Sequence, residues 1–316
     1  MISQRITPQL SIKYIIHEIK RNMEYNVYEI NPEYDFVISG VSFIGDPIDG
    51  TVLFVTKKVK NFLKNLVSRK DCLVFIQEGI DIPKDYKTNN CFVVSEDPQL
   101  DYARFALKLK QVEKEKERKR IYTLTPEGFY VGENVKLGKN VVIEPNCRIG
   151  HDVVIGDNAF IGFGSCIDNA EIGDNFVCKG RSAIGVDAFF MAEGENKFRI
   201  PSFGKVYIGN YVDISSNVTV ERGFNSHTVI KDNTKIDSNV CIGHDDIIGE
   251  NVVVTSGASI AGLVSIGKNV YVGMNATVKQ RLSIGNDAMI GMGSVVISNV
   301  KDGISVFGNP AVKFGV

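Results

Sequence analysis

The chain has 316 residues, of which 44% are hydrophobic and 23% charged, a composition typical of a globular protein with one large or two medium domains. Its formal net charge of −1 excludes the strongly basic character of proteins that bind nucleic acid or anionic lipid. The sequence contains no run of about 18 apolar residues and no leader-like segment with a cleavage site, so we expect a cytoplasmic protein without a membrane span.

The six cysteines are spread along the chain without a Cys-x-x-Cys pair, so we expect no structural zinc site and no other bound metal. Buried free thiols in a reducing cytoplasm are the interpretation that fits this pattern. The positions are Cys72, Cys91, Cys147, Cys166, Cys178 and Cys241.

Residues 1–121 show no internal repeat and predict a small α/β domain, because short β-branched and aromatic segments alternate with helical ones. The predicted strands span 35–41, 51–55, 72–76 and 91–95, and the predicted helices span 58–68 and 97–120. We interpret the charged run at Glu113–Arg120 as a solvated helix end or linker, not as a nucleic-acid patch.

From about Val131 onward, aliphatic residues recur every six positions. The unbroken part of the series is Ile230, Ile236, Ile242, Ile248, Val254, Ile260, Ile266, Val272, Val278, Ile284, Ile290 and Val296. A period of six fits neither an α-helix nor an ordinary strand and is the signature of a parallel β-helix. Three hexads close one coil of about 18 residues, and successive coils stack about 4.8 Å apart. We therefore predict a mainly β fold, with a β-helix over 122–306 and a C-terminal tail over 307–316.

Two segments interrupt the repeat. A loop over 190–206 is extruded from the predicted coils, and a shorter bulge spans Gly223–Val229. Since a strict solenoid gains no stability from such segments, we expect them to contribute to function. A neutral surface insertion is the alternative.

Two of the four histidines lie in nearly the same phrase. His151 lies in IEPNCRIGHDVV (143–154) and His244 in IDSNVCIGHDDI (236–247), so the phrase alone does not tell which one is chemical. His244 follows both interruptions, whose loops could enclose it. His151 lies in early, regular coils and is interpreted as an exposed corner residue.

The order of these parts resembles the UDP-3-O-acylglucosamine N-acyltransferases of lipid A biosynthesis and related nucleotide-sugar N-acyltransferases. The resemblance rests on ISGVSFIGDPIDGTVLFV, EDPQLDYARFA, RIPSFGKVYIG, NVTVERGFNSHTVI, KIDSNVCIGHDDIIGEN and SIAGLVSIG, and it covers nearly the whole chain. It implies a left-handed β-helix, an N-terminal domain that helps to bind a nucleotide, and homotrimers with active sites between neighbouring β-helices. Three-fold packing would also cover the flat faces of the solenoid.

The resemblance also implies roles for single residues. It places the general base in the segment KIDSNVCIGHDD, which selects His244. Histidine suits this role because it titrates near neutral pH and can take the proton that an amine loses as it attacks a thioester. One coil is about 18 residues, so Gly262 stacks on His244, and similar enzymes present a backbone amide to the thioester oxygen there. Asp237 matches an acidic position and could orient the imidazole, bind the sugar or satisfy only its own corner.

Further matches concern the acceptor. Phe54 matches an aromatic residue that stacks the base, and the bulge residue Asn225 is expected to shape the sugar site. Glu221 and Arg222 match a segment that usually reads Asp-Arg-Gly, and Arg199 matches a basic position in the extruded loop. Either arginine could meet the diphosphate, since its fork suits phosphate oxygens, or could instead form a structural salt bridge.

Gln280 and Arg281 are expected to contact the donor, although the family has a histidine where Arg281 stands. Lys57 and Lys60 also replace the Asn and Tyr that accompany the stacking aromatic, which puts uracil as the base in doubt. The ending SVFGNPAVKFGV resembles the short tail of sugar acetyltransferases rather than the helices that bind acyl carrier protein. These departures favour acetyl-CoA as the donor.

The resulting hypothesis is an N-acyltransferase, without a tightly bound cofactor, that acetylates a nucleotide-linked amino sugar for O-antigen, capsule or glycan biosynthesis. The alternative is a lipid A-type enzyme that uses an acyl carrier protein thioester. A non-catalytic β-helix that only binds a partner is a remote third reading. The sugar, the position of its amine and the nucleotide stay open.

Overall fold

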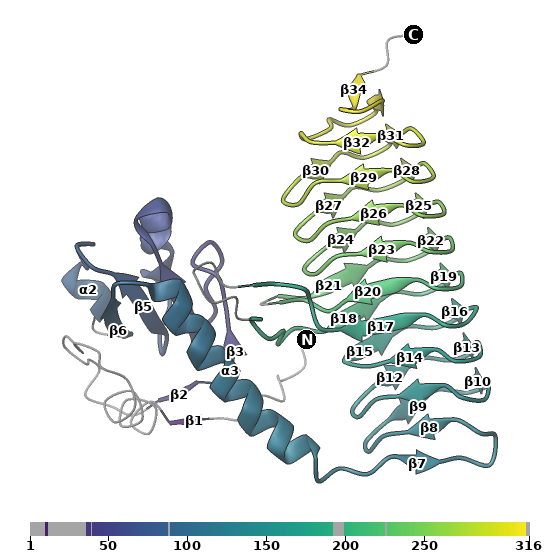
Figure 1. Ribbon diagram of the computed structural model, residues 1–316, viewed down its shortest axis with the longest axis horizontal. Helices are drawn as coiled ribbons and strands as arrows, with labels where there is room; N and C mark the ends of the chain where they lie inside the picture. The colour runs from purple at the N-terminus through teal and green to yellow at the C-terminus, as the bar shows by residue number, and fades with distance from the viewer. Residues whose placement is uncertain are drawn as a thin grey trace. The chain divides into compact units, whose positions relative to one another are not determined.

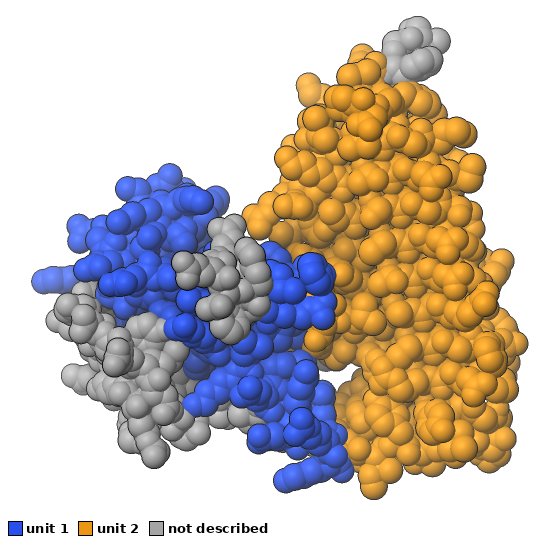
Figure 2. All heavy atoms as spheres, viewed as in Figure 1, with its two compact units in different colours: residues 1–119, 189–203 blue, residues 120–188, 204–316 orange. Residues whose placement is uncertain are grey.

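The computed structural model describes residues 10–11, 36–38, 40–87, 89–191, 199–224 and 226–313. The chain forms two compact units, which are coloured separately in Figure 2. Unit 1 comprises residues 1–119 together with 189–203, and unit 2 comprises residues 120–188 and 204–316. Most of the segment that the sequence predicts as an extruded loop therefore groups with the N-terminal unit.

Unit 1 contains a four-stranded parallel sheet in the order β3-β4-β5-β6. The strands are β3 (Gly40–Val41), β4 (Thr51–Val55), β5 (Leu73–Gln77) and β6 (Cys91–Ser95). The helix α3 (Pro98–Glu117) packs against β4 and β5. Outside this sheet lie the antiparallel pair β1 (Leu10–Ser11) and β2 (Val37–Ile38) and the short helix α2 (Lys84–Lys87). The small α/β domain expected from the sequence is confirmed.

The segment between β4 and β5 differs from its prediction, because it forms a 3₁₀ helix, η1 (Lys57–Leu66), instead of an α-helix. Leu63 and Leu66 bury the apolar side of η1. The sequence KKVKNFLKNL carries several lysines and no acidic residue, and like charges three or four positions apart oppose α-helical turns. Thr56 also makes no side-chain cap at the start of the helix.

Unit 2 is a parallel β-helix whose coils stack in sequence order (Figure 1), with three faces that are each one sheet. The first face contains β7 (Thr123–Leu124), β8 (Tyr130–Val131), β11 (Arg148–Ile149), β14 (Cys166–Ile167), β17 (Ala183–Val186), β20 (Thr219–Glu221), β23 (Cys241–Ile242), β26 (Ser259–Ile260), β29 (Thr277–Val278) and β32 (Val295–Val296). The second face contains β9 (Lys136–Leu137), β12 (Val154–Ile155), β15 (Ala170–Ile172), β18 (Val206–Ile208), β21 (Thr228–Ile230), β24 (Ile247–Ile248), β27 (Ser265–Ile266) and β30 (Ser283–Ile284). The third face contains β10 (Val142–Ile143), β13 (Phe160–Ile161), β16 (Val177–Cys178), β19 (Asp213–Ile214), β22 (Lys235–Ile236), β25 (Val253–Val254), β28 (Tyr271–Val272), β31 (Met289–Ile290), β33 (Ser305–Phe307) and β34 (Val312–Lys313).

The hexapeptide aliphatics form the core of the β-helix. In regular coils each residue pairs with the residue one coil later, as Ile242 pairs with Ile260 and Ile260 with Val278. These side chains are buried, and each buried Ile or Val contributes about 1.5–3 kcal/mol relative to exposure. The parallel β-helix predicted from the period of six is confirmed.

Both interruptions leave the β-helix at one corner, which connects the first face to the second. The first lies between β17 and β18, and the second lies between β20 and β21. We call this corner, over the whole stack, the insertion edge. The insertion edge is therefore the corner at which we look for the polar and reactive side chains of a site.

All six cysteines are free thiols, and no group of three or more potential metal ligands converges within the described ranges. Of the helices that can be traced in those ranges, none combines the length and the apolarity needed to cross a membrane.

Candidate active site

Both histidines of the repeated phrase lie on the insertion edge. His151 lies between β11 and β12, and His244 lies between β23 and β24. Gly262 and Arg281 follow His244 on the same edge in the next two coils, and Arg222 directly follows β20. The insertion edge thus carries residues that are up to 130 positions apart in the sequence, counted from 151 to 281, and six coils separate these two.

The imidazole of His244 is held by the carboxylate of Asp245. Nδ1 of His244 lies 2.7 Å from Oδ2 of Asp245, whose side chain is 1% exposed. The same carboxylate accepts the backbone amides of Phe224 at 2.8 Å and Ser226 at 2.7 Å. A carboxylate that receives these donors acts as an acceptor, so Nδ1 carries the proton and Nε2 carries the lone pair.

The bulge after β20 supports this pair from behind. The ring of the fully buried Phe224 lies 6.3 Å from the imidazole, at an interplanar angle of 69°. The amide of Asp245 donates to Oγ1 of Thr228 at 2.9 Å, where the bulge ends. A Cβ on Gly223 would lie 2.2 Å from the carbonyl oxygen of Ser226, so the bulge can take this shape only with glycine there. The bulge therefore places Asp245, and Asp245 places His244.

Gly262 lies against the ring of His244. A Cβ on Gly262 would lie 2.5 Å from Nε2 and 2.7 Å from Cδ2 of the imidazole, so a larger residue fits only if the imidazole shifts. At equivalent corners a side chain of the next coil caps this backbone amide, as Nδ1 of His151 caps Glu133 at 2.8 Å. In the coil after Gly262 the equivalent capping position is occupied by Gln280, whose side chain is exposed. Within the described ranges no acceptor binds the amide of Gly262. A backbone donor therefore adjoins Nε2 of His244.

His151 is used differently, although it occupies the same corner. Its Nδ1 accepts the Glu133 amide at 2.8 Å, so the proton of a neutral ring lies on Nε2, the opposite tautomer from that of His244. Its ring also packs on Tyr122, with the centroids 4.4 Å apart. His151 is therefore a structural cap of its coil.

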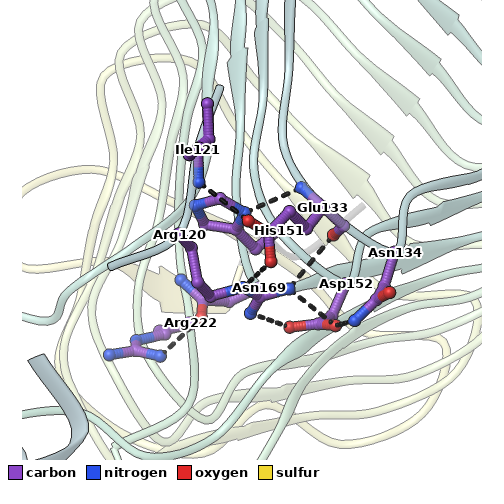
Figure 3. A network of polar contacts seen from close by, with 8 residues as sticks. All are labelled: Arg120, Ile121, Glu133, Asn134, His151, Asp152, Asn169 and Arg222. Atoms are coloured by element: carbon purple, nitrogen blue, oxygen red, sulfur yellow. Dashed lines mark hydrogen bonds and ion pairs between the residues drawn. The ribbon is translucent and has the colours of Figure 1, made fainter. Parts of the chain in front are cut away.

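The aspartate that follows His151 confirms this difference. Asp152 corresponds to Asp245, but it pairs with the guanidinium of Arg120, as Figure 3 shows. Arg120 also reaches Glu133, whose carboxylate accepts the Ile121 amide at 2.9 Å. This network ties the start of unit 2 to its early coils, and it holds Asp152 on Arg120, whereas Asp245 is held on His244.

Asp237 does not contact the imidazole. It is exposed, and its Oδ1 accepts the adjacent Ser238 amide at 2.7 Å. The orienting role expected of Asp237 falls to Asp245, which sequence reasoning missed. Aspartate after a corner histidine is an ordinary residue for the left-handed turn, so the phrase carried no signal of its role. That Asp237 binds the sugar stays a prediction.

Arg222 forms the structural salt bridge that the sequence left open. Its Nε lies 2.7 Å from Oδ1 of Asp187, and its Nη1 lies 2.8 Å from Oδ1 of Asn169 (Figure 3). The guanidinium is only 5% exposed, so its donors are not available to a diphosphate. The structure favours the salt-bridge alternative, because Asp187 at the start of the first interruption already pairs with Arg222, and an acceptor contact of Arg222 remains an untested prediction.

The other predicted β-helix residues lie near this site with less defined contacts. Glu221 is partly buried at the end of β20, and Gln280 and Arg281 are exposed. The amide of Arg281 donates to the carbonyl of Gly262 at 3.2 Å. Asn225 lies outside the described residues. Donor binding by Gln280 and Arg281 remains a prediction.

Phe54 and Arg199 belong to unit 1. Phe54 lies on β4, and its ring packs 5.1 Å from that of Tyr102 on α3, which covers part of its surface. Arg199 is exposed, with its guanidinium 5.1 Å from the centroid of the Phe189 ring. Within the described ranges no carboxylate pairs with Arg199, so of the two candidate arginines it is the one that a phosphate can reach.

The stacked hexapeptide coils and the His–Asp–Gly arrangement define a class of protein. A model of the family described as bacterial transferase hexapeptide (six repeats) matches residues 134–169. A solved UDP-N-acetylglucosamine acyltransferase from Francisella novicida is 27% identical, with a TM-score of 0.56, and covers 61% of this chain and 70% of its own. One from Bacteroides fragilis is 26% identical, with a TM-score of 0.55, and covers 61% of this chain and 74% of its own. The chain therefore has the fold of a left-handed parallel β-helix built from hexapeptide repeats.

Curated relatives narrow the similarity to nucleotide-sugar N-acyltransferases. UDP-3-O-acylglucosamine N-acyltransferase 1 of Gloeobacter violaceus is 39% identical over 84 residues, which are 26% of this chain and 24% of the relative. The UDP-3-O-acylglucosamine N-acyltransferase of Dechloromonas aromatica is 46% identical over 69 residues, which are 22% of this chain and 20% of the relative. The chain thus spans about a quarter of the length of the curated relatives it matches.

Proposed function

We propose that this protein is an N-acyltransferase that moves an acyl group from a thioester to the amine of a nucleotide-linked amino sugar. The observation that carries the proposal is the stack of Asp245, His244 and Gly262 on the insertion edge. It offers a base, a group that orients the base, and a backbone donor within one small volume. Each of these three groups accelerates amide formation from a thioester.

In this reaction Nε2 of His244 accepts the proton of the amine as the new C–N bond forms. The amide of Gly262 donates to the carbonyl oxygen, which becomes negative in the tetrahedral intermediate. The C–S bond then breaks, and His244 returns the proton to the leaving thiolate. Asp245 stabilises the imidazolium between the two transfers. A positioned base contributes about 10²–10⁴-fold, and one oxyanion donor contributes about 10²–10³-fold.

The acceptor that we propose is a UDP-linked, 3-O-acylated glucosamine, and the donor is an acyl carrier protein thioester. The ending SVFGNPAVKFGV favours acetyl-CoA, but the relatives are named UDP-3-O-acylglucosamine N-acyltransferases, which supports the lipid A-type alternative better. Arg199 is the proposed partner of the diphosphate, and Phe54 the proposed partner of the base. We further propose that the protein works as a homotrimer.

A second candidate, an acetyl-CoA-dependent enzyme, is favoured by the surface that adjoins His244. In the next two coils, the strands beside the insertion edge turn small polar side chains outward. These exposed residues are Ser259, Thr277, Ser265 and Ser283. These side chains provide no apolar surface against which a long acyl chain could pack on this face. An acetyl group requires no such surface.

The two candidates are separated by mass spectrometry of the products. The purified protein is incubated with UDP-3-O-acylglucosamine and with a panel of other nucleotide-linked amino sugars. Each acceptor is offered acetyl-CoA, a longer acyl-CoA or a 3-hydroxyacyl-acyl carrier protein. Transfer of the hydroxyacyl group to UDP-3-O-acylglucosamine supports the first candidate, and transfer of acetyl alone supports the second.

The histidine phrase supplies a matched pair of variants for the same assay. We expect His244→Ala to lower kcat by about 10²–10⁴-fold, since it removes the base. His151→Ala removes the other histidine of the phrase, and its kcat should stay within about threefold of wild type. Full activity of His244→Ala would overturn the proposed mechanism, and absence of transfer to every acceptor from every donor would overturn the proposed function.

A further inference from the structure

One interior residue of the insertion edge does not fit the repeat. In five other coils this position is buried and holds a small or β-branched residue, namely Val153, Ala170, Val206, Thr228 or Val264, and in the coil of Arg281 it holds the partly buried Leu282. The coil of His244 instead holds Asp246, which is 0% exposed. A carboxyl group in an apolar core costs free energy unless its oxygens are hydrogen-bonded. The repeat itself gives no reason for an acid there.

The two oxygens of Asp246 bind the backbone on both sides of the candidate site. Oδ2 accepts the amide of Gly243, the residue before His244, at 3.1 Å. Oδ1 accepts the amide of Val264, two residues after Gly262, at 2.8 Å. One carboxyl group therefore bridges the coil of the base and the coil of the backbone donor.

We propose that Asp246 is a positioning residue that fixes the distance between Nε2 of His244 and the amide of Gly262. This inference rests on the proposed function, because the distance matters only if both groups act on one substrate. The space between Gly262 and the imidazole is narrow, because a single carbon added to Gly262 would lie 2.5 Å from Nε2. A small shift of either coil would therefore change the distance between base and donor. A valine at this position would keep the core filled but would release the Val264 amide, and the Gly243 amide would keep only its bond to the carbonyl of Ile260 at 2.9 Å.

The electrostatics of the site agree with this role. Burial raises the pKa of Asp246 to about 9, the amides of Val264 and Gly243 oppose the rise, and the nearby carboxylates of Asp245 and Glu221 add to it. At neutral pH Asp246 is therefore protonated. The protonated carboxyl group accepts backbone amides without placing a second negative charge near the imidazole. Asp245 then balances the charge of the imidazolium.

The first test compares Asp246→Val with Asp246→Asn in steady-state kinetics and thermal melting. For Asp246→Val we expect kcat to fall about 10–100-fold, as for a displaced reacting group, with the acceptor KM within about threefold and no loss of melting temperature. Asp246→Asn should recover most of kcat, because its carboxamide oxygen can still accept the Val264 amide. A kcat of Asp246→Val within twofold of wild type would overturn the proposal.

Thr234→Val is the matched control. Thr234 is also fully buried, and its hydroxyl donates to the carbonyl of Gly249 at 2.9 Å, at the corner between the second and third faces. It removes a buried polar group of the same solenoid without touching the insertion edge. Its kcat should be unchanged, and a loss equal to that of Asp246→Val would show that both variants act through general core stability.

A second readout does not depend on turnover. The chain has four histidines, so the imidazole resonances can be followed by NMR and the signal of His244 assigned with His244→Gln. Asp246→Val should shift the His244 signal and leave that of His151 in place, whether or not the acyl transfer itself is found. An unmoved His244 signal would sink the proposal independently of the proposed function. If the valine variant does not fold, Asp246→Ala takes its place, because alanine also lacks both acceptors and the equivalent position of another coil holds the buried Ala170.

Discussion

At the scale of residues, the candidate site is decided by hydrogen-bond partners and not by residue types. His151 and His244 share the same phrase and the same corner, yet Nδ1 of one accepts a backbone amide and Nδ1 of the other meets a carboxylate. The partner sets the tautomer, and the tautomer decides which nitrogen can take a proton. Only His244 therefore presents a basic Nε2 beside a backbone donor.

Gly262→Ala tests the closeness of the two groups. Its methyl group would lie 2.5 Å from Nε2 of His244, so the imidazole must shift and the coil should still close. We expect kcat to fall by about 10²–10³-fold, as for loss of an aligned donor, with a nearly unchanged melting temperature. Gly45→Ala is the control, since an added Cβ there meets nothing within 4 Å. Equal activity of the two variants would contradict the assigned geometry.

Asp246 also makes stability depend on pH. Its pKa rises from an ordinary value of 3.8 to about 9 on folding, so the folded state binds this proton more tightly. The resulting stabilisation is complete below about pH 4 and is lost as the pH rises toward 9, at about 1.4 kcal/mol per pH unit. Between pH 5 and 8 the free energy of unfolding should fall by on the order of 4 kcal/mol more in wild type than in Asp246→Val. Urea unfolding at both pH values measures it, and parallel pH profiles would contradict it.

At the scale of elements, each segment at the insertion edge holds the next segment in place. Arg222 ties the root of the first interruption to an early coil through Asp187 and Asn169. The bulge that begins after Arg222 then presents the amides that hold Asp245. The bulge that breaks the repeat thus shapes the site, because two of its amides hold one carboxylate beside the imidazole.

Arg222→Met should weaken this support. It leaves Asp187 and Asn169 without their cation, and since Asp187 is 38% exposed, water compensates part of the loss. We expect the free energy of unfolding to fall by about 1–3 kcal/mol, below the full cost of breaking a buried pair. Lys268→Met removes the exposed pair with Glu250, at 3.8 Å, and should cost less than about 0.5 kcal/mol. Chemical denaturation compares the two, and equal losses would argue against the clamp.

At the scale of the whole molecule, unit 2 is a quasi-one-dimensional stack in which each coil contacts mainly its neighbours. The corner between the second and third faces shows this in an amide ladder. Nδ2 of Asn233 donates to Asn251 at 2.8 Å, and Nδ2 of Asn251 donates to Asn269 at 3.2 Å, all three residues having positive φ. Tyr211 interrupts the column, with φ of 58° and 60% of its surface exposed.

Tyr211→Asn should extend the ladder. Asparagine tolerates the left-handed conformation better than tyrosine and can bond its neighbours in the column, so we expect a gain of about 1 kcal/mol and a higher melting temperature. Asn233→Ala removes an amide from the same ladder and should lower the melting temperature. A lower melting temperature for Tyr211→Asn would mean that the tyrosine side chain makes a stabilising contact outside the ladder.

Much of the fold followed from the sequence, because its signals are local and repeated. A period of six is imposed by the same inward position in every coil, so the core residues could be read directly from the series that ends at Val296. The strands at 51–55 and 91–95 were equally clear from their composition. The 3₁₀ form of η1 could not be predicted, because it depends on a small energy difference set by repulsion among its lysines. Helix propensity does not resolve that difference.

The sequence by itself determined the solenoid, the small α/β domain and the stacking of Gly262 over His244, since each follows from a period or a spacing. Tertiary structure alone decided which partner each polar group meets. The bulge amides that hold Asp245 beside the imidazole, Asp187 bound to Arg222, and the Val264 amide bound to Asp246 all join separate coils. Hydrogen bonds depend on distances of a few tenths of an ångström between such segments, and no local pattern in a sequence encodes those distances.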